Sequence, residues 1–311
     1  MVAAFVFPLR VGGEIDRLKP VSTLIINADD FGLTAGVNRA IGELHASHVL
    51  TSTTLMARAK ATEEAIQQAL ATPTLGVGCH VVLVDGEPLL SPTRDLPHLA
   101  DPLQGQFRRK LGGFLLWLHG LKRDGSSATI RAAEIEAEAY AQISSLAARG
   151  LRLTHIDTHK HTHMFPAVLR PVLRAARRAG IHVVRNPFEP AWSVRATPGA
   201  PWLRRFEVNT LRRLEKNFKK IVAEEGFVTT DGAVGVLATG TLDAATVRTL
   251  LAALPRQGVF ELVSHPGYND ADLRQAHTRL LASRELERAA LNELVHATGH
   301  ELVSFAALGA R

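Results

Sequence analysis

Short apolar, β-branched runs alternate along this chain with longer segments in which apolar residues recur every three or four positions. The runs have the length of buried strands, and the longer segments have the period of amphipathic helices. Several runs are apolar on both faces, as strands covered by helices on both sides are. The alternation predicts βα units and a parallel α/β sheet, closed or open. The predicted strands are residues 22–28, 48–56, 75–83, 152–159, 181–186, 232–238 and 259–265.

Capping residues mark the ends of the predicted helices. Pro166 suits the first turn of one helix, and Gly180 suits the position just after its end. A second helix is predicted from about 129 to 149, with Gly150 as its stop. Thr34 can cap a third helix, which follows the first strand.

Residues 85–128 interrupt the alternation. They are rich in proline, glycine and loop-forming residues, which indicates an insertion over one end of the sheet. Irregular connections of this length often act as lids or substrate loops. No segment has the composition of a linker, so residues 21–311 are expected to form one domain, preceded by an N-terminal extension at 1–20.

Composition favours a globular protein of a reducing compartment. Hydrophobic residues make up 46% and charged residues 21% of the 311 residues, which is enough apolar surface for a large core. Cys79 is the single cysteine, so an intrachain disulfide is excluded and a cytoplasmic location is expected. No signal peptide or spanning segment is evident, and the apolar stretch at 111–120 would be at most an interfacial element.

The formal net charge of +6 is concentrated in one segment. Residues 204–222 combine helical apolar spacing with seven basic side chains, which predicts a basic amphipathic helix. The favoured interpretation is a solvated surface helix, and the alternative is peripheral contact with an anionic membrane. Nucleic acid is not an expected partner, because no aromatic-interleaved basic motif accompanies the segment. The sequence is compatible with a homo-oligomer.

Titratable residues follow the apolar cores of four predicted strands. In parallel α/β sheets the carboxyl ends of the strands are where active sites are built. One aspartate with two histidines is a ligand set suited to a catalytic divalent metal. Of two adjacent aspartates, one can bind the metal while the other accepts a proton from water, and a histidine opposite can protonate a leaving amine. The residues at these strand ends are Asp29, Asp30, His80, His155, Asp157, His159 and His265.

Five sequence motifs carry a family resemblance. NADDFG, TSTTLM, GVGCHVVL, THIDTHKHTHMFP and ELVSHPGY, in this order within residues 22–270, resemble the YdjC-like carbohydrate deacetylases. IINADDFGLTAGVNRAI, LVDGEPLLSP and VVRNPFEPAW look most like the subgroup associated with hopanoid biosynthesis. The resemblance implies a distorted TIM-like (β/α) barrel of the polysaccharide-deacetylase type, and about seven parallel strands agree with it.

Roles for five residues follow from the resemblance. It implies that Asp30, His80 and His159 bind one metal ion, that Asp29 is the general base and that His265 is the general acid. It also implies Mg²⁺, whereas the Asp-His-His set would equally suit Zn²⁺. Arg185 in VVRNP would hold the base carboxylate or contact substrate.

The histidines of THIDTHKHTHM cannot all bind one metal ion. If the stretch were extended, His155 and His163 would be about 26 Å apart at ~3.3 Å per residue. The helix expected from Pro166 suggests that the strand ends near His159. Asp157 is then expected to orient an imidazole, and His155 and His163 are expected to be structural. His161 stays open between a contact with substrate and a structural hydrogen bond.

The expected function is hydrolytic removal of acetyl from an N-acetylglucosaminyl substrate. The finer expectation is a hopanoid glycolipid, which the protein would meet at the inner face of the membrane. The alternatives are another metal-dependent hydrolase, such as a phosphoesterase or amidohydrolase, or a catalytically silent glycolipid-binding protein. The chain has no G-x-S-x-G, P-loop, G-x-G-x-x-G or H-E-x-x-H motif. Serine hydrolases, kinases and dinucleotide enzymes therefore lose support.

Overall fold

One parallel sheet forms the centre of the computed structural model, which describes residues 22–309 apart from 102, 122–123, 277, 279 and 297–299. The predicted N-terminal extension lies outside the described residues. The strand order is β6-β3-β2-β1-β8-β7, and β9 pairs with the start of β1. The strands are β1 Thr23–Phe31, β2 Ser52–Leu55, β3 Gly76–Val81, β6 Ile156–Thr158, β7 Gly232–Val234, β8 Val259–Ser264 and β9 Glu301–Leu302.

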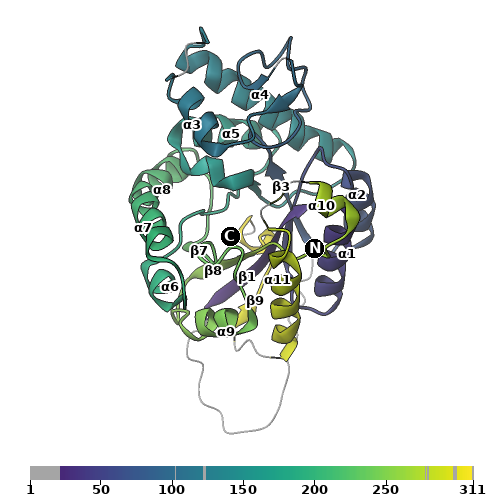
Figure 1. The fold of residues 1–311 in the computed structure, drawn as a ribbon, viewed down its shortest axis with the longest axis vertical. Helices are drawn as coiled ribbons and strands as arrows, with labels where there is room; N and C mark the ends of the chain where they lie inside the picture. Colours follow the sequence, from purple (N-terminus) through teal and green to yellow (C-terminus); the bar gives the residue numbers. More distant parts are fainter. Residues whose placement is uncertain are drawn as a thin grey trace.

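Helices surround this sheet, as Figure 1 shows. Thr34 caps α1 as predicted, because its hydroxyl accepts a hydrogen bond from the Val37 amide at 3.3 Å. Pro166 opens α5, also as predicted. The α-helices are α1 Ala35–Ala46, α2 Thr62–Ala71, α3 Leu111–Leu118, α4 Ala128–Ala148, α5 Pro166–Arg178, α6 Ala191–Ala196, α7 Trp202–Leu211, α8 Glu215–Glu224, α9 Ala244–Ala252, α10 Ala271–Gln275, α11 Ser283–Asn292 and α12 Ala306–Gly309; the 3₁₀ turns are η1 His159–Met164, η2 Arg212–Leu214 and η3 Glu293–His296.

The segment 182–188 links the two outer strands, β6 and β7. Val184 forms a parallel bridge with Ile156, the first residue of β6, and the Phe188 carbonyl accepts a hydrogen bond from Ala233 in β7 at 3.0 Å. The sheet thereby curls into the predicted distorted TIM-like barrel. The strand predicted at 181–186 is reduced to isolated bridges, because Val183 pairs with Val228 whereas Val184 pairs with Ile156, so neither ladder continues.

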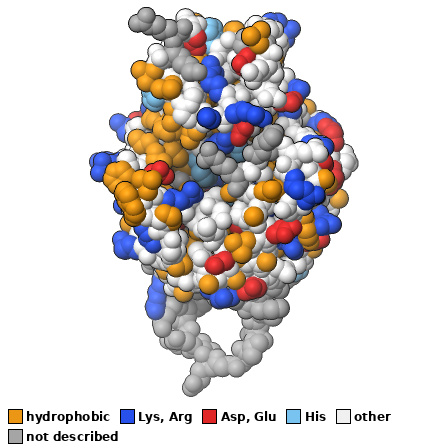
Figure 2. Space-filling model, viewed as in Figure 1, with side chains coloured by type: hydrophobic (Ala, Val, Ile, Leu, Met, Phe, Trp, Pro, Cys, Tyr) orange, Lys and Arg blue, Asp and Glu red, His pale blue; other side chains and the backbone are white. Residues whose placement is uncertain are grey.

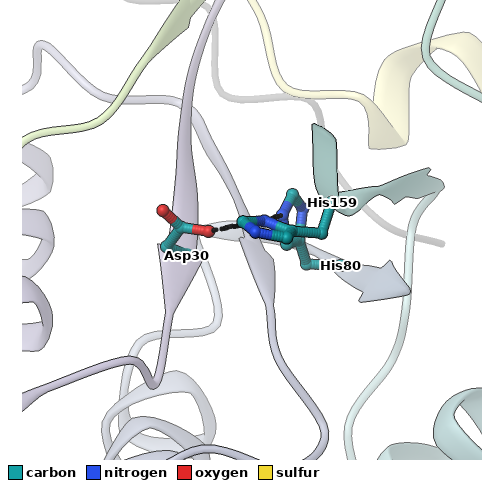
Figure 3. A group of neighbouring side chains, drawn as sticks. All are labelled: Asp30, His80 and His159. Carbon is teal, nitrogen blue, oxygen red and sulfur yellow. Dashed lines mark hydrogen bonds and ion pairs between the residues drawn. The ribbon is translucent and has the colours of Figure 1, made fainter. Parts of the chain in front are cut away.

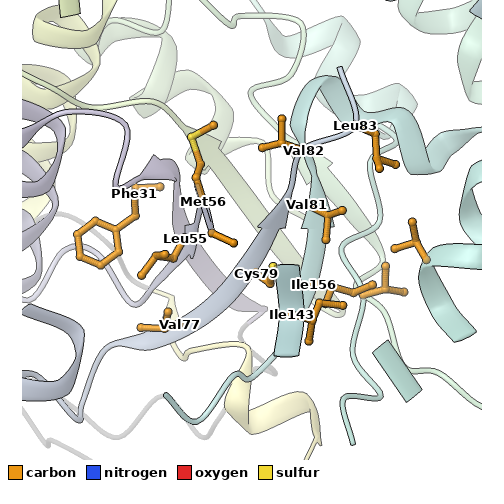
Figure 4. Packing of buried hydrophobic residues seen from close by; sticks show 14 of the residues in the cluster. Phe31, Leu55, Met56, Val77, Cys79, Val81, Val82, Leu83, Ile143 and Ile156 are labelled. Carbon is orange, nitrogen blue, oxygen red and sulfur yellow. The ribbon is translucent and has the colours of Figure 1, made fainter. Parts of the chain in front are cut away.

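The core fills both sides of the curled sheet. Figure 4 shows Leu55, Cys79, Val81 and Ile156 packed together between strands and helices. Cys79 is fully buried, and this burial raises the pKa of its thiol well above its usual range, so the thiol stays protonated and unreactive. Its neighbour His80 points to the opposite face of β3, as the two-residue period requires.

The stretch 85–128 contains a small antiparallel hairpin and a short helix. The hairpin is β4 Ala100–Asp101 with β5 Gln106–Phe107, and α3 follows. Phe114 and Trp117 of α3 are fully buried, so the largest apolar side chains of the predicted interfacial stretch face the protein. None of the helices in the described ranges combines the length and the apolar character that crossing a bilayer requires.

The basic segment 204–222 is not one regular helix. The structure divides it into the end of α7, the turn η2 and most of α8. The apolar face of α8 packs on the core through Phe218, Ile221 and Val222, whereas α7 has no buried residue. Only the second half of the segment therefore follows the amphipathic pattern that was predicted.

Candidate active site

The two neighbouring carboxylates at the end of β1 contribute to one site because the strand is irregular there. Successive side chains of a regular strand point to opposite faces. The register between β1 and β2 shifts between Ala28 and Phe31, and Asp30 has a φ of 64°, in the left-handed region. This bulge lets Asp29 and Asp30 both contact side chains of the barrel interior.

Asp30, His80 and His159 form a compact group, which we call the ligand trio. Oδ1 of Asp30 lies 3.4 Å from Nε2 of His80 and 3.4 Å from Nδ1 of His159. The two imidazole nitrogens are 3.2 Å apart. Figure 3 shows the three side chains converging from different segments, with β1 carrying Asp30 and β3 carrying His80.

The ligand trio fits a divalent metal ion. Atoms that bind one ion at about 2.1 Å are themselves about 3.0 to 3.4 Å apart in tetrahedral or octahedral geometry, which matches the observed triangle. Oδ1 of Asp30 is buried and accepts no hydrogen bond from the described residues. A buried carboxylate oxygen without a donor is suited to accept a cation.

A second group, Asp29, His80 and Asp157, is also compact enough for an ion. Its carboxylates, however, already accept bonds from Arg185, Thr54 and other donors. We therefore assign the metal position to the ligand trio and a supporting role to the second group.

Asp157 holds the imidazole of His80. Its Oδ1 lies 2.8 Å from Nδ1 of His80, and its Oδ2 accepts the hydroxyl of Thr54 at 3.1 Å. Burial lowers the pKa of His80, but the charge of Asp157 outweighs it and keeps the pKa well above its usual range. The contact fixes the ring so that Nε2 faces Asp30. This is the orienting contact expected for Asp157.

Arg185 holds Asp29 with two hydrogen bonds. Nη1 donates to Oδ2 at 2.8 Å and Nη2 donates to Oδ1 at 2.5 Å. Burial would raise the pKa of Asp29, but the guanidinium outweighs it and keeps the pKa well below its usual range. Asp29 is therefore ionised at neutral pH. Arg185 is fully buried and also contacts Asp157 and Glu261, so its contacts are with protein carboxylates rather than with the site opening.

His265 lies between two carboxylates, Asp29 and Glu287. Its Nε2 is 3.7 Å from Oδ2 of Asp29, and its Nδ1 is 3.7 Å from Oε2 of Glu287. Burial lowers the pKa of His265, but Glu287 and then Asp29 raise it, and the net shift is upward. The imidazole is thus kept ready to donate a proton.

Two residues that the sequence did not single out support this site from α11. Arg284 donates from Nη2 to Oδ2 of Asp30 at 2.5 Å, and Glu287 accepts a hydrogen bond from the His265 amide at 2.6 Å. Both are buried, and their three-residue spacing places them on one face of the helix. The stretch RELERAA at 284–290 does not distinguish these two residues, because charged residues at this spacing are common on solvated helices.

The other histidines of THIDTHKHTHM lie outside the ligand trio, and the rings of His161 and His163 meet edge to face with centroids 6.3 Å apart. His155 is fully buried and stacks on Phe305 with ring centroids 3.8 Å apart. His163 is also buried, and its ring nitrogens contact the Thr158 hydroxyl and the Arg185 carbonyl. His161 has a φ of 51°, and its Nδ1 is buried without a partner among the described residues. Burial and then Arg185 lower the pKa of His161 to about 3, so its ring is neutral.

A hollow of about 540 Å³ lies at the carboxyl end of the sheet, where residues that follow β1, β2 and β3 line it, although none of the ligand trio does. Lys160, which follows His159 in the chain, donates to Oδ2 of Asp85 at 2.6 Å and to the Arg109 carbonyl at 3.1 Å, and both of these residues line the hollow. The volume lies within the range of small-molecule sites. The charged residues of its wall are Arg58, Lys60, Asp85, Glu87, Arg109 and Asp272.

Comparisons with known proteins find relatives that cover most of this chain. The family model of YdjC-like proteins matches residues 23–297. A carbohydrate deacetylase of Brevibacillus brevis is 32% identical over 292 residues, which cover 92% of this chain and 99% of the relative. A chitooligosaccharide deacetylase of Salmonella paratyphi B is 36% identical over 160 residues, covering 51% of this chain and 57% of the relative. A solved Enterococcus faecalis structure, named as a candidate cellobiose-phosphate cleavage protein, has a TM-score of 0.71 and 24% identity, covers 93% of this chain and 99% of its own, and supports the fold.

Proposed function

Because the chain belongs to the family of YdjC-like proteins, we propose that it is a metal-dependent deacetylase that hydrolyses the acetamide group of an N-acetylated sugar. The observation that carries this proposal is the placement of an ionised aspartate and a proton-bearing histidine beside one ligand trio. His265 Nε2 and Asp29 Oδ2 are 3.7 Å apart, and Asp29 is next to the metal-binding Asp30. A base and an acid next to a metal position are the groups that amide hydrolysis needs.

Each residue has a defined part in the proposed reaction. A divalent ion bound by Asp30, His80 and His159 would polarise the acetyl carbonyl and make water a better nucleophile. Asp29 accepts a proton from that water, and Arg185 keeps its carboxylate ionised and aimed. His265 donates its proton to the departing sugar amine. Neither Mg²⁺ nor Zn²⁺ is excluded by a set of one carboxylate and two imidazoles, although imidazole favours Zn²⁺.

The substrate is proposed to carry an N-acetylglucosaminyl group. The hollow at the carboxyl end of the sheet is lined by charged side chains, which suit the hydroxyl groups of a sugar. Arg109 reaches it from the inserted stretch 85–128, so we propose that this stretch forms a wall of the substrate cleft. The motifs shared with the hopanoid-associated subgroup support a glycolipid as the finer proposal, with a soluble chitooligosaccharide as its comparison.

An acetate-release assay tests this function. The protein would be incubated with N-acetylglucosaminyl glycolipid or with a chitooligosaccharide, in the presence of Mg²⁺, Zn²⁺ or neither, and products would be followed by mass spectrometry. We expect the loss of one acetyl group and a metal requirement. Asp29→Asn should lower the rate by at least about 100-fold while the metal stays bound, whereas the surface variant Asp95→Asn should keep the wild-type rate.

Other results would point to the alternatives. An unchanged rate in Asp29→Asn would contradict the assigned base. Two metal ions per protein together with phosphate release from a phosphoester would indicate a phosphoesterase. Tight sugar binding without turnover in any metal would indicate a binding protein.

A further inference from the structure

The helix α7 exposes a large apolar surface. None of its ten residues is buried, and Trp202, Leu203 and Phe206 are 78%, 52% and 62% exposed. Their spacing places them on neighbouring positions of one helical turn, and we call them the apolar face of α7. Figure 2 shows hydrophobic side chains gathered over this part of the molecule, with lysine and arginine side chains beside them. Three adjacent large apolar side chains exposed to solvent indicate a surface that binds a protein or a membrane.

The helix is held firmly in this position. Nε of Arg204 donates to the Leu237 carbonyl at 2.9 Å, and Nε of Arg205 donates to the Ala200 carbonyl at 3.2 Å. Arg205 also donates to the carbonyls of Val194 and Thr197. The guanidinium groups thus tie α7 to the protein through backbone atoms, and the apolar face is directed to solvent on a fixed helix.

A hollow bordered by several cationic side chains is formed mainly by residues that directly follow α7 in the chain. It is bordered by Arg212, Arg213, Lys216 and Lys219, with Glu215 as its one carboxylate. Glu215 pairs with Lys219 at 2.7 Å. Within the described ranges, Arg212, Arg213 and Lys216 form no ion pair. We call this group the basic hollow, and its excess positive charge suits phosphate-bearing groups.

From these two neighbouring features we infer that α7 and the basic hollow form a docking surface for a bilayer that contains anionic phospholipid. The apolar face of α7 enters the headgroup and acyl boundary, and the basic hollow takes the phosphate groups. An apolar face beside a basic hollow complements an anionic bilayer, whereas a second copy of this chain would bring the same positive charge and be repelled.

Docking at this surface would bring the active-site end of the barrel to the membrane. Arg204 contacts Leu237, which lies just beyond the carboxyl end of β7. The carboxyl ends of β1, β3 and β8 carry or directly precede Asp30, His80 and His265. In a parallel barrel these ends share one side of the molecule.

Vesicle sedimentation tests the docking surface. The full chain would be mixed with vesicles of a zwitterionic phospholipid alone, or with vesicles that also contain an anionic phospholipid in equal amount. We expect binding to the anionic vesicles that weakens as salt is raised. Trp202→Ser with Phe206→Ser should lower the partition coefficient at least about ten-fold. Arg213→Gln with Lys216→Gln should lower it about five-fold for each charge removed.

Matched variants separate the docking surface from general charge and hydrophobicity. Arg152→Gln with Arg256→Gln removes the same charge from exposed positions that precede β6 and β8, at the opposite end of the barrel. Leu70→Ser removes an apolar side chain that is 45% exposed on α2. Both controls should bind vesicles as the wild type does, and all variants should keep the deacetylation rate on a soluble sugar.

Three results would overturn the inference. These are equal binding to the two kinds of vesicle, variants of α7 that bind like the wild type, and a dimer in light scattering that Trp202→Ser dissociates. The last result would assign the apolar face of α7 to a second copy of the chain.

Discussion

Glu287 controls the proton affinity of His265 from a helix that follows it in the chain. Its carboxylate is fully buried, accepts the His265 amide at 2.6 Å and lies 3.7 Å from Nδ1 of the ring. A fixed negative charge at this distance favours the imidazolium form. Glu287 is therefore a positioning residue for the proposed acid.

Glu287→Gln should move the alkaline limb of the pH–rate profile to lower pH. A general acid works only while it is protonated, so the rate falls as pH rises through its pKa. Removing the charge of Glu287 removes the main cause of the upward pKa shift of His265. Measuring the deacetylation rate across pH tests this, with Glu285→Gln as the exposed control on the same helix. A limb that does not move would mean that Glu287 has only a structural role.

Some residues of the proposed site can be predicted from the sequence, and others cannot. Asp29, His80 and His265 directly follow or end apolar strand cores, where a charged group is unusual and therefore informative. Arg284 and Glu287 lie on a helix, where such residues normally face water. Their burial depends on the docking of α11 against the barrel, which no local pattern expresses.

At the scale of elements, η1 shows where the alternation of THIDTHKHTHM stops being a strand. The strand β6 ends at Thr158, next to the predicted end near His159, and the chain turns at once. Lys160 and His161 both have positive φ, at 55° and 51°. Such conformations persist only where surrounding contacts hold them, and here the Thr158 hydroxyl contacts Thr162 and the backbone and ring of His163.

Thr158→Val should weaken metal binding without removing any proposed ligand. Valine has nearly the shape of threonine but cannot make these hydrogen bonds. The turn η1 is then no longer held to the end of β6, and the side chain of His159 is no longer fixed in direction. We expect a loss of metal affinity of about ten-fold or more, measured by titration calorimetry. Thr230→Val is the matched control, because the Thr230 hydroxyl is buried without a hydrogen-bond partner among the described residues. Equal affinities in the two variants would contradict the anchoring role of Thr158.

At the scale of the whole molecule, buried neutral histidines couple folding to pH. Burial lowers the pKa of His155 to about 3 and that of His163 to about 4, from an ordinary value of 6.5. Below pH 6.5 the unfolded chain takes up protons that these folded-state rings do not accept. The free energy of unfolding therefore falls as pH falls through this window.

His163→Gln should make the folded state less sensitive to acid. Each ring that is neutral when folded and charged when unfolded contributes a slope of about 1.4 kcal/mol per pH unit. Urea unfolding of the metal-free protein at several pH values between about 5 and 6 gives the slope, which should be smaller in the variant by this amount. The variant's absolute stability is not the readout, so a general destabilisation does not affect the test. An unchanged slope would show that His163 is charged in the folded protein.

The barrel itself was accessible from the sequence, because repeated apolar runs and helices leave few arrangements for a parallel sheet. The closure of the barrel could not be predicted from the sequence. The link between β6 and β7 consists of single bridges at 182–188, and β9 is two residues long. Pairings this short depend on the chain segments that the rest of the fold brings together, and they leave little trace in local patterns.

The position of α11 has a consequence for the order in which the site is completed during synthesis. Asp30, His80 and His159 all leave the ribosome before β8, which is the neighbour that β1 needs on its second side. A nascent chain ending soon after His265 would contain every proposed catalytic and metal-binding residue, yet it would lack both Arg284 and Glu287. The newly made protein would thus contain its ligands before the residues that hold Asp30 and His265 in place, so the site is complete only when α11 packs against the barrel.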